Sequence, residues 1–428
     1  MNPGEPARTV SGRLKALRPF SRRRFLAGAG GLAVAGAAAG CAASRSGAGP
    51  ARATRARAGS GEGALGQLGE QPPGLPARQY AWDEYLDRDE FGNAVAPKFD
   101  RLLMFDVNGT PTTAHRDRLE AALRRLERQY EWNNRGLLFL AAWGHGYFTR
   151  KLRVAAPIPL AEQLSSFETP VIEDYDLCLH LASDDEQRLR RVTAALVAEL
   201  RPLLTLRDTR NGFTGVGLPY RRQGVGGIPA GERVPKTSPL YMGFKSALKK
   251  NQATEDAVAI AEGPFLDGTT MHVSYMSLTL GSWYEALDQR QRVALMYSPQ
   301  TTVEAAERFT TDAESNPDQI GQAIAKYGTI GHSQSCATAR RANKPIILRR
   351  DFDTTDGGVA GLNFVCLQQR IEDFIKTRTA MNQANAPLQN PQITNTVNNG
   401  INAFIIVTKR ANFIVPSRAD RSFPLLNA

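Results

Sequence analysis

The stretch Arg101-Leu-Leu-Met-Phe-Asp-Val107 opens the pattern that decides the fold of this 428-residue chain. Its central apolar residues predict a buried strand. The next apolar residues recur every three or four positions, which predicts an amphipathic helix; they are Leu119, Leu123, Leu126 and Tyr130. Further strands are predicted at 136–142, 176–182 and 203–206, and a second helix over 189–200. The order is therefore β-α-β-β-α-β.

The C-terminal half repeats this order. Strands are predicted at 271–280, 345–349, 361–367 and 402–407, and helices over 282–296 and 370–381. A segment rich in Gly, Pro and Arg, 215–237, separates the halves and predicts a long connecting loop. The sequence therefore predicts an α+β protein of two ferredoxin-like domains, which we place at 80–225 and 226–428.

The basic charge of the chain lies mostly outside these domains. The formal net charge is +11, but the first sixty residues contain 11 Lys or Arg and 1 Glu and account for +10 of it. A nucleic-acid interface needs basic residues gathered on a folded face. We therefore predict no nucleic-acid partner.

The N-terminal segment has the pattern of an export signal. Ser21-Arg-Arg-Arg-Phe-Leu26 precedes a Gly- and Ala-rich apolar run that is too short and too weakly hydrophobic to predict a membrane span. We predict a twin-arginine signal over 1–41, export by the twin-arginine machinery to the periplasm or the exterior, and a disordered linker over 42–79. Lipidation of Cys41, which would anchor the protein, is left open. Since this route exports folded proteins, often with a cofactor inserted inside the cell, we expect a cofactor site.

The remaining cysteines and the histidines predict no independent metal or redox site. Cys178, Cys336 and Cys366 form no C-x-x-C pair, and their odd number argues against a disulfide framework. The sequence contains no G-x-S-x-G, phosphate-loop or H-E-x-x-H motif. Four histidines are too scattered to predict a metal cluster: His115, His145, His180 and His272.

Six short segments occur in an order and at spacings that are typical of one protein family. Three lie in the first half: Leu103-Met-Phe-Asp106, Gly144-His-Gly-Tyr-Phe148 and Asp176-Leu-Cys-Leu-His-Leu-Ala-Ser-Asp-Asp185. Three lie in the second half: Gly243-Phe-Lys-Ser-Ala247, Arg340-Arg-Ala-Asn-Lys-Pro-Ile-Ile-Leu-Arg-Arg350 and Gly361-Leu-Asn-Phe-Val365. Over most of residues 95–410 the chain thus resembles the dye-decolorising (Dyp-type) peroxidases, which are haem enzymes. The resemblance implies two ferredoxin-like domains of the dimeric α/β barrel superfamily type.

The resemblance also implies which residues bind haem b. In the family a histidine shortly before an I-L-R element ligates the iron, and His332 lies seventeen residues before Arg349. His332 is thus implied as the metal ligand. Arg349, rather than Arg350, is implied as the distal arginine that holds peroxide and stabilises developing charge. Phe244, in the segment that resembles the family's G-F-x-D-G motif, is implied as a further haem-binding residue.

The chain departs from the family at Ser246. There the family has the aspartate that transfers a proton between the two peroxide oxygens, and a serine hydroxyl has no acid–base equilibrium near neutral pH. General acid–base catalysis typically contributes about 10²- to 10⁴-fold in rate. We therefore expect turnover to be impaired or to rest on Arg349 and water, unless another carboxylate replaces the aspartate; the alternatives are Glu255, Asp256 and Asp267.

A second departure concerns the haem propionates. Family members often carry basic residues in the strand that corresponds to Ser274-Tyr-Met-Ser-Leu-Thr-Leu280, and this chain has none there. Four arginines elsewhere are the alternatives: Arg340, Arg341, Arg221 and Arg222.

We therefore expect an exported haem peroxidase that reduces hydrogen peroxide and oxidises an unidentified organic reductant. Two alternatives stay open: a non-catalytic haem-binding or iron-handling protein, and a haem-free descendant of the fold. The sequence also leaves open whether the protein forms a homo-oligomer.

Overall fold

The computed structural model describes residues 74–214, 240–244, 251–307 and 315–426. The predicted export signal over 1–41, the predicted domain boundary after residue 225 and the site residue Ser246 lie outside this part of the chain. Residues 74–79, part of the predicted linker, belong to the fold. Gln79 is fully buried, and its Oε1 accepts a hydrogen bond of 2.9 Å from the backbone N–H of Ala141. The folded part therefore begins before Tyr80.

The first half of the sequence forms four antiparallel strands in the spatial order β7-β3-β6-β4. In chain order they are β3 (Phe99–Val107), β4 (Leu138–Gly144), β6 (Leu177–Ser183) and β7 (Leu204–Phe213). This is the strand order of a ferredoxin-like β-α-β-β-α-β unit. The side chains of β4 and β6 are buried throughout, which explains why these strands read as continuous apolar runs rather than as alternating ones.

The second half forms a matching set of strands in the spatial order β12-β8-β11-β9, and β10 also pairs with β11. The strands are β8 (Thr269–Leu278), β9 (Leu348–Arg349), β10 (Phe352–Thr354), β11 (Gly361–Gln368) and β12 (Ile405–Val415). Strand β4 pairs with β12, and β10 pairs with β7 as well as with β11, so the two halves close one sheet into a barrel. The predicted α+β fold class is confirmed.

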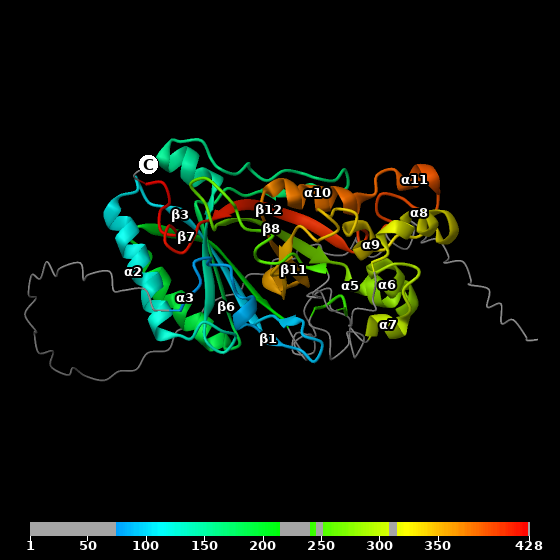
Figure 1. Ribbon diagram of the computed structural model, residues 1–428, viewed down its shortest axis with the longest axis horizontal. Helices are drawn as coiled ribbons and strands as arrows, with labels where there is room; N and C mark the ends of the chain where they lie inside the picture. The colour runs from blue at the N-terminus through cyan, green and yellow to red at the C-terminus, as the bar shows by residue number, and fades with distance from the viewer. Residues whose placement is uncertain (1–73, 215–239, 245–250, 308–314, 427–428) are drawn as a thin grey trace, which may run out of the picture. The chain divides into compact units, whose positions relative to one another are not determined.

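Helices cover both halves of the sheet. Figure 1 shows α2 (Thr113–Gln129) and α3 (Glu186–Leu200) side by side over the first half and α10 (Ile371–Asn382) along the second. The Thr112 hydroxyl caps α2 and the Asp185 carboxylate caps α3, each by accepting a backbone N–H of the first turn. The short helices of the second half lie near one end of that half. They are α5 (Leu280–Glu285), α6 (Gln289–Met296), α7 (Val303–Glu307), α8 (Ile320–Gln322), α9 (His332–Cys336) and α11 (Ala386–Gln389).

The remaining elements are short. They are the strands β1 (Asp87–Arg88), β2 (Ala94–Val95) and β5 (Val171–Ile172), and the 3₁₀ or π turns at Asp83–Tyr85, Tyr147–Leu152, Pro317–Gln319, Ala323–Tyr327 and Asp356–Gly358. No helix in the described ranges is long and apolar enough to span a membrane.

Two predicted elements of the second half differ from those observed. The helix predicted over 282–296 is broken into α5 and α6, because the Asp288 carboxylate and the Gln291 side chain form a capping box that starts a new helix. The strand predicted over 345–349 is reduced to Leu348–Arg349. The preceding Ile346 and Ile347 line a cavity instead, which accounts for their apolar character.

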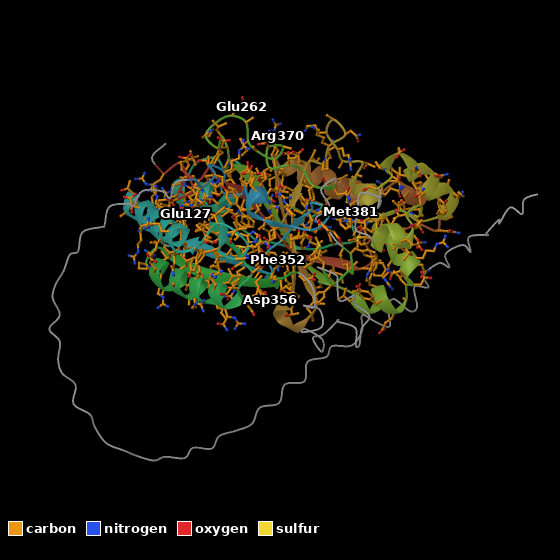
Figure 2. All side chains as sticks on the ribbon, turned by 60° about the horizontal axis from the view of Figure 1, so that its bottom comes forward. Glu127, Glu262, Phe352, Asp356, Arg370 and Met381 are labelled. Atoms are coloured by element: carbon orange, nitrogen blue, oxygen red, sulfur yellow. The ribbon has the colours of Figure 1, made fainter. Side chains whose placement is uncertain are left out.

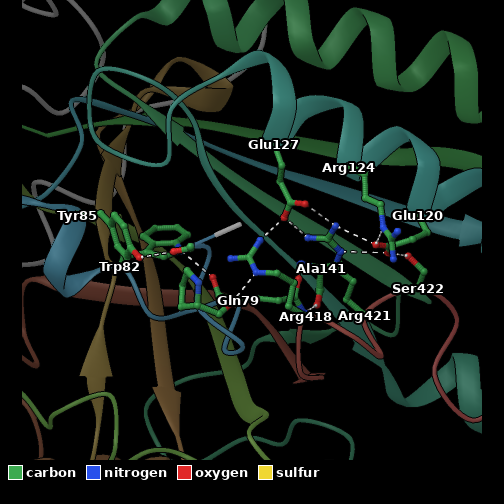
Figure 3. A network of polar contacts seen from close by, with 12 residues as sticks. Gln79, Trp82, Tyr85, Glu120, Arg124, Glu127, Ala141, Arg418, Arg421 and Ser422 are labelled. Carbon is green, nitrogen blue, oxygen red and sulfur yellow. Dashed lines mark hydrogen bonds and ion pairs between the residues drawn. The ribbon is translucent and has the colours of Figure 1, made fainter. Parts of the chain in front are cut away.

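The segment after β12 is attached to α2 by buried ion pairs (Figure 3). The Arg418 and Arg421 guanidiniums are almost fully buried and both contact the Glu127 carboxylate. Arg421 also binds Glu120, whose Oε2 accepts a hydrogen bond of 2.7 Å from the Ser422 hydroxyl. These contacts hold the end of the barrel strand β12 in place.

Candidate functional site

A large cavity lies in the second half of the molecule, among β8, β11, β12, α9 and α10. The empty space within it and at its open mouth together amounts to about 1440 Å³. The wall is mostly apolar and includes Met242, Met276, Leu278, Ile347, Phe364 and Met381. Met381, which is labelled in Figure 2, comes from α10. The wall therefore suits a mainly apolar ligand.

His332 lies in the wall of this cavity as the first residue of α9. A glycine precedes it because a Cβ at Gly331 would be 1.9 Å from the carbonyl oxygen of Tyr297. Burial and the nearby guanidiniums of Arg349 and Arg378 lower the pKa of His332 to about 3. Its imidazole is therefore neutral at physiological pH, the form that ligates metals.

The Cys336 thiol is a neighbour of His332 that the sequence analysis did not assign to the site. Its Sγ is 3.7 Å from Nδ1 of His332, and burial raises the pKa of Cys336 to about 11, which keeps it a thiol. Their separation of four residues places the two side chains on one face of a helix, a signal that was present in the sequence. The three cysteines of the described ranges are free, and no group of three or more His, Cys, Asp or Glu side chains in those ranges is arranged to hold a metal ion.

Arg349 lines the same cavity, and Arg350 does not. The backbone N–H of Arg349 donates to Oε1 of Gln252 at 2.9 Å, which fixes the strand. The Arg350 guanidinium lies on the other side of the strand, 3.0 Å from a Glu255 oxygen and 5.5 Å from the centre of the Trp82 ring. The structure therefore brings Arg349 and His332 together and separates Arg350 from them.

Phe244 also lies in the wall, in edge-to-face contact with Tyr297 at 5.5 Å between ring centres. The Tyr297 hydroxyl is buried without a hydrogen-bond partner in the described part of the chain, and burial raises its pKa. An unpaired buried hydroxyl in a cavity wall is a group that a bound ligand can satisfy. Sequence reasoning did not single out Tyr297.

The three alternative carboxylates are not among the residues of the cavity wall. Glu255 accepts the backbone N–H of Trp82 and binds Arg350. Asp256 and Asp267 both pair with Arg78, one of the residues just before the predicted start of the fold. Arg350 and Arg78, which lie far away from these carboxylates in the sequence, thus hold them outside the described cavity wall. Among the described residues of the wall, the one carboxylate is Asp351, which the sequence analysis did not consider.

Three further arginines line the cavity: Arg340, Arg378 and Arg410. Arg341 does not; its guanidinium is 2.6 Å from an Asp373 oxygen. Arg221 and Arg222 lie outside the described residues. Arg410 of β12 is directly opposite Ser274 of β8 in the sheet register. The neighbouring strand thus supplies the basic residue that 274–280 lacks.

Arg378 and Arg410 form a buried cluster with excess positive charge. Both guanidiniums contact one carboxylate, Glu168, at 3.2 and 2.8 Å, and both arginines are at most 5% exposed. Burial lowers the pKa of Arg410 to about 10, so it stays charged at neutral pH. Nε of each arginine and Nη1 of Arg410 have no hydrogen-bond acceptor among the described residues. Unused charged donors beside an apolar cavity fit the acidic groups of a ligand.

Several solved structures share this fold, and they are Dyp-type peroxidases. A putative Dyp-type peroxidase from Shewanella oneidensis is 18% identical, with a TM-score of 0.52 over 76% of this chain and 94% of its own. DypB from Rhodococcus jostii RHA1 is 12% identical, with a TM-score of 0.54 over 77% and 96%. The dye-decolorizing protein from V. cholerae is 13% identical, with a TM-score of 0.52 over 79% and 98%. At such identities the similarity establishes the fold and not the activity.

The sequence itself places the chain in a family. A search of curated protein sequences finds no match. Residues 97–417, most of the chain, match the family model described as "Family of unknown function (DUF7405)". The protein therefore belongs to the DUF7405 family, and its fold is that of the Dyp-type peroxidases.

Proposed function

We propose that this protein binds haem b and reduces hydrogen peroxide with electrons from an organic reductant. The observation that carries the proposal is the convergence of His332 and Arg349 on one large, mostly apolar cavity. A Rhodococcus jostii DypB variant of the same fold has been solved in complex with heme. That protein is 13% identical to this chain, so the support from it is the fold alone.

The described residues of the cavity fit a haem. A haem is a broad apolar macrocycle with an iron at its centre and two carboxylates at one edge. The apolar wall suits the macrocycle, and the neutral imidazole of His332 suits the iron. The unused N–H groups of Arg378 and Arg410 suit the carboxylates.

Each residue of the site has a distinct proposed task. When bound, haem supplies the iron centre for the redox chemistry. His332 would hold that iron through a ring nitrogen. Arg349 would orient peroxide by hydrogen bonding and stabilise negative charge on the departing oxygen, since a guanidinium does not lose its proton. Phe244 would pack against the macrocycle.

Replacement of a histidine tests this proposal. Wild-type protein from haem-replete cells should purify with about one haem per chain and a strong Soret band. His332→Ala should lose the haem but still unfold in one cooperative transition on heating. His145→Ala, outside the cavity wall, should keep both the haem and the cooperative transition. A His332→Ala protein that retains stoichiometric haem contradicts the ligand assignment. A colourless wild-type protein would favour a haem-free descendant of the fold.

A second function, non-catalytic haem binding or iron handling, is favoured by one observation. Ser246 stands where the resemblance places the proton-transferring aspartate. This function predicts a Soret band together with negligible peroxide-dependent oxidation of dyes. Measurement of both properties on one preparation separates it from the peroxidase.

We also propose that the protein is exported by the twin-arginine route with its haem already inserted. The support is the Ser21-Arg-Arg-Arg-Phe-Leu26 motif ahead of an apolar run. Replacement of Arg22 and Arg23 by Lys should leave the full-length protein inside the cell. Unchanged export of that variant would contradict the proposal.

A further inference from the structure

We propose that Asp351 is the acid–base residue of this cavity, a role that rests on the proposed reduction of peroxide. That reaction needs a group that takes a proton from one peroxide oxygen and gives it to the other. Ser246 cannot do so alone, because its hydroxyl does not ionise near neutral pH. Another carboxylate in the same cavity is therefore required for rapid turnover.

The backbone places Asp351 beside Arg349. Side chains alternate between the two sides of an extended chain, so residues two apart point the same way. The structure follows this rule: Arg349 and Asp351 line the cavity, and Arg350 binds Glu255 and Asp83 instead. The two cavity residues thus put a permanent positive charge and a carboxylate on neighbouring parts of one wall.

Other carboxylates near this strand are engaged. Asp353, two residues further on, is fully buried in β10 and accepts the backbone N–H of Tyr241 at 2.6 Å. Asp100 is buried against Nε2 of His180 at 2.8 Å. By contrast, the Asp351 carboxylate has no hydrogen bond or ion pair within the described ranges, and its side chain is only half-buried. It is therefore free to exchange a proton with a small molecule in the cavity.

The proton transfer can be written in full. The Asp351 carboxylate accepts a proton from one oxygen of hydrogen peroxide and donates it to the other oxygen. The O–O bond breaks as this proton arrives, so the departing oxygen leaves as water, and Arg349 stabilises the negative charge that this oxygen carries until the proton is transferred. Two electrons from the organic reductant and two further protons convert the other oxygen to a second water. Asp351 ends as the carboxylate in which it began.

The test uses two amide variants of the haem-loaded protein. Asp351→Asn removes the proton acceptor with little change in shape, and Asp353→Asn is the matched control on the same segment. The first readout is the association rate of cyanide, which enters mainly as HCN and must lose its proton to bind iron. The second is the rate of the spectral change caused by hydrogen peroxide. Haem content and the thermal unfolding transition are measured on every variant.

Asp351→Asn should slow both processes by about 10²- to 10⁴-fold at unchanged haem content, and Asp353→Asn should leave both near the wild-type rates. Asp351→Glu should recover part of the loss, because it restores a carboxylate. If Asp351→Asn binds cyanide and reacts with peroxide as fast as wild type, the inference is wrong while the haem proposal stands. A wild-type protein that takes up no haem contradicts both.

Discussion

Gly400 lies directly against His332. A Cβ at Gly400 would be 3.0 Å from Cα and 3.2 Å from the backbone nitrogen of His332. Gly400 has a left-handed φ of +54°, and its N–H donates to the Ile330 carbonyl at 2.8 Å. The position of the proposed iron ligand therefore depends on the absence of a side chain in a different loop.

Gly400→Ala should weaken haem binding through this contact. The added methyl group must push the His332 backbone aside, and the left-handed conformation itself costs alanine roughly 1–2 kcal/mol. If the loop relieves that strain by moving His332, haem affinity should fall about tenfold. Haem titration followed at the Soret band measures this. Gly281→Ala is the control, since a Cβ there meets nothing within 4 Å; equal affinities for the two variants would contradict the argument.

Arg410→Met should reduce the preference of the cavity for acidic porphyrins. We expect the wild-type apoprotein to bind iron-free protoporphyrin IX more tightly than its dimethyl ester, because the ester has no charge to pair with the Arg378 and Arg410 cluster. A hydrogen bond to a charged group contributes about 1.5–3 kcal/mol, so the preference should be roughly tenfold or more. Fluorescence quenching measures both affinities without iron.

The control for this prediction is Arg341→Met. The Arg341 guanidinium pairs with Asp373 outside the cavity wall, so its loss should leave the preference unchanged. Equal binding of the acid and the ester by the wild-type protein would show that the buried cluster does not recognise carboxylates.

The regular elements could be predicted from sequence because each has its own periodicity. Strand β3 and helices α2 and α3 appear within a few residues of their predicted positions. Strand β10 was missed: Phe352–Thr354 is too short to give an alternating pattern, although it joins the two halves of the barrel. The break between α5 and α6 was missed because the Asp288 capping box is weaker as a signal than the apolar spacing around it.

The candidate site likewise contains residues that the sequence predicts and residues that it does not. His332 and Arg349 could be found from motifs, since both belong to one short stretch of chain. The cluster of Glu168, Arg378 and Arg410 could not be found from sequence, because these residues are brought together only by the fold. That Asp256 and Asp267 lie outside the described wall could not be predicted for a related reason: Arg78, far away along the chain, binds both of them.

His272 should make the apoprotein less stable in acid. Its ring stacks on Phe374 at 3.6 Å, with Nδ1 bonded to Asn412 Oδ1 and Nε2 to the Ser274 hydroxyl. Burial, followed by the charge of Arg410, lowers its pKa to about 3. Between about pH 6.5 and pH 3 the unfolded chain therefore binds a proton that the folded chain refuses, so the free energy of unfolding falls as the pH falls.

Urea unfolding at several pH values between 4 and 6 measures this effect. Compared with wild type, His272→Gln should be less stable near pH 7, because the stack and the hydrogen bonds are lost. The slope of its free energy of unfolding against pH should also be smaller, by an amount that corresponds to the binding of up to one proton. Identical slopes for the two proteins would show that His272 does not titrate in this way.

Loss of a carboxylate should destabilise the protein more in the buried cluster that joins α2 to the segment after β12 than in the exposed ion pair between α2 and α3. Glu127→Gln leaves the buried guanidiniums of Arg418 and Arg421 without their shared carboxylate (Figure 3). Removal of one partner from a buried pair typically costs about 3–5 kcal/mol, because the remaining charge is neither hydrated nor neutralised. Glu199→Gln, whose partner Arg125 is half exposed, should cost less than about 1 kcal/mol.

The two variants are compared by urea unfolding at one pH. Strand β12 leads directly into the segment that carries Arg418 and Arg421, and it also supplies Arg410 to the cavity. Glu127→Gln should therefore lower the free energy of unfolding and also loosen haem binding, whereas Glu199→Gln should do neither. Equal stability losses would mean that water reaches the Arg418 and Arg421 guanidiniums and that the cluster does not hold the segment after β12 against α2.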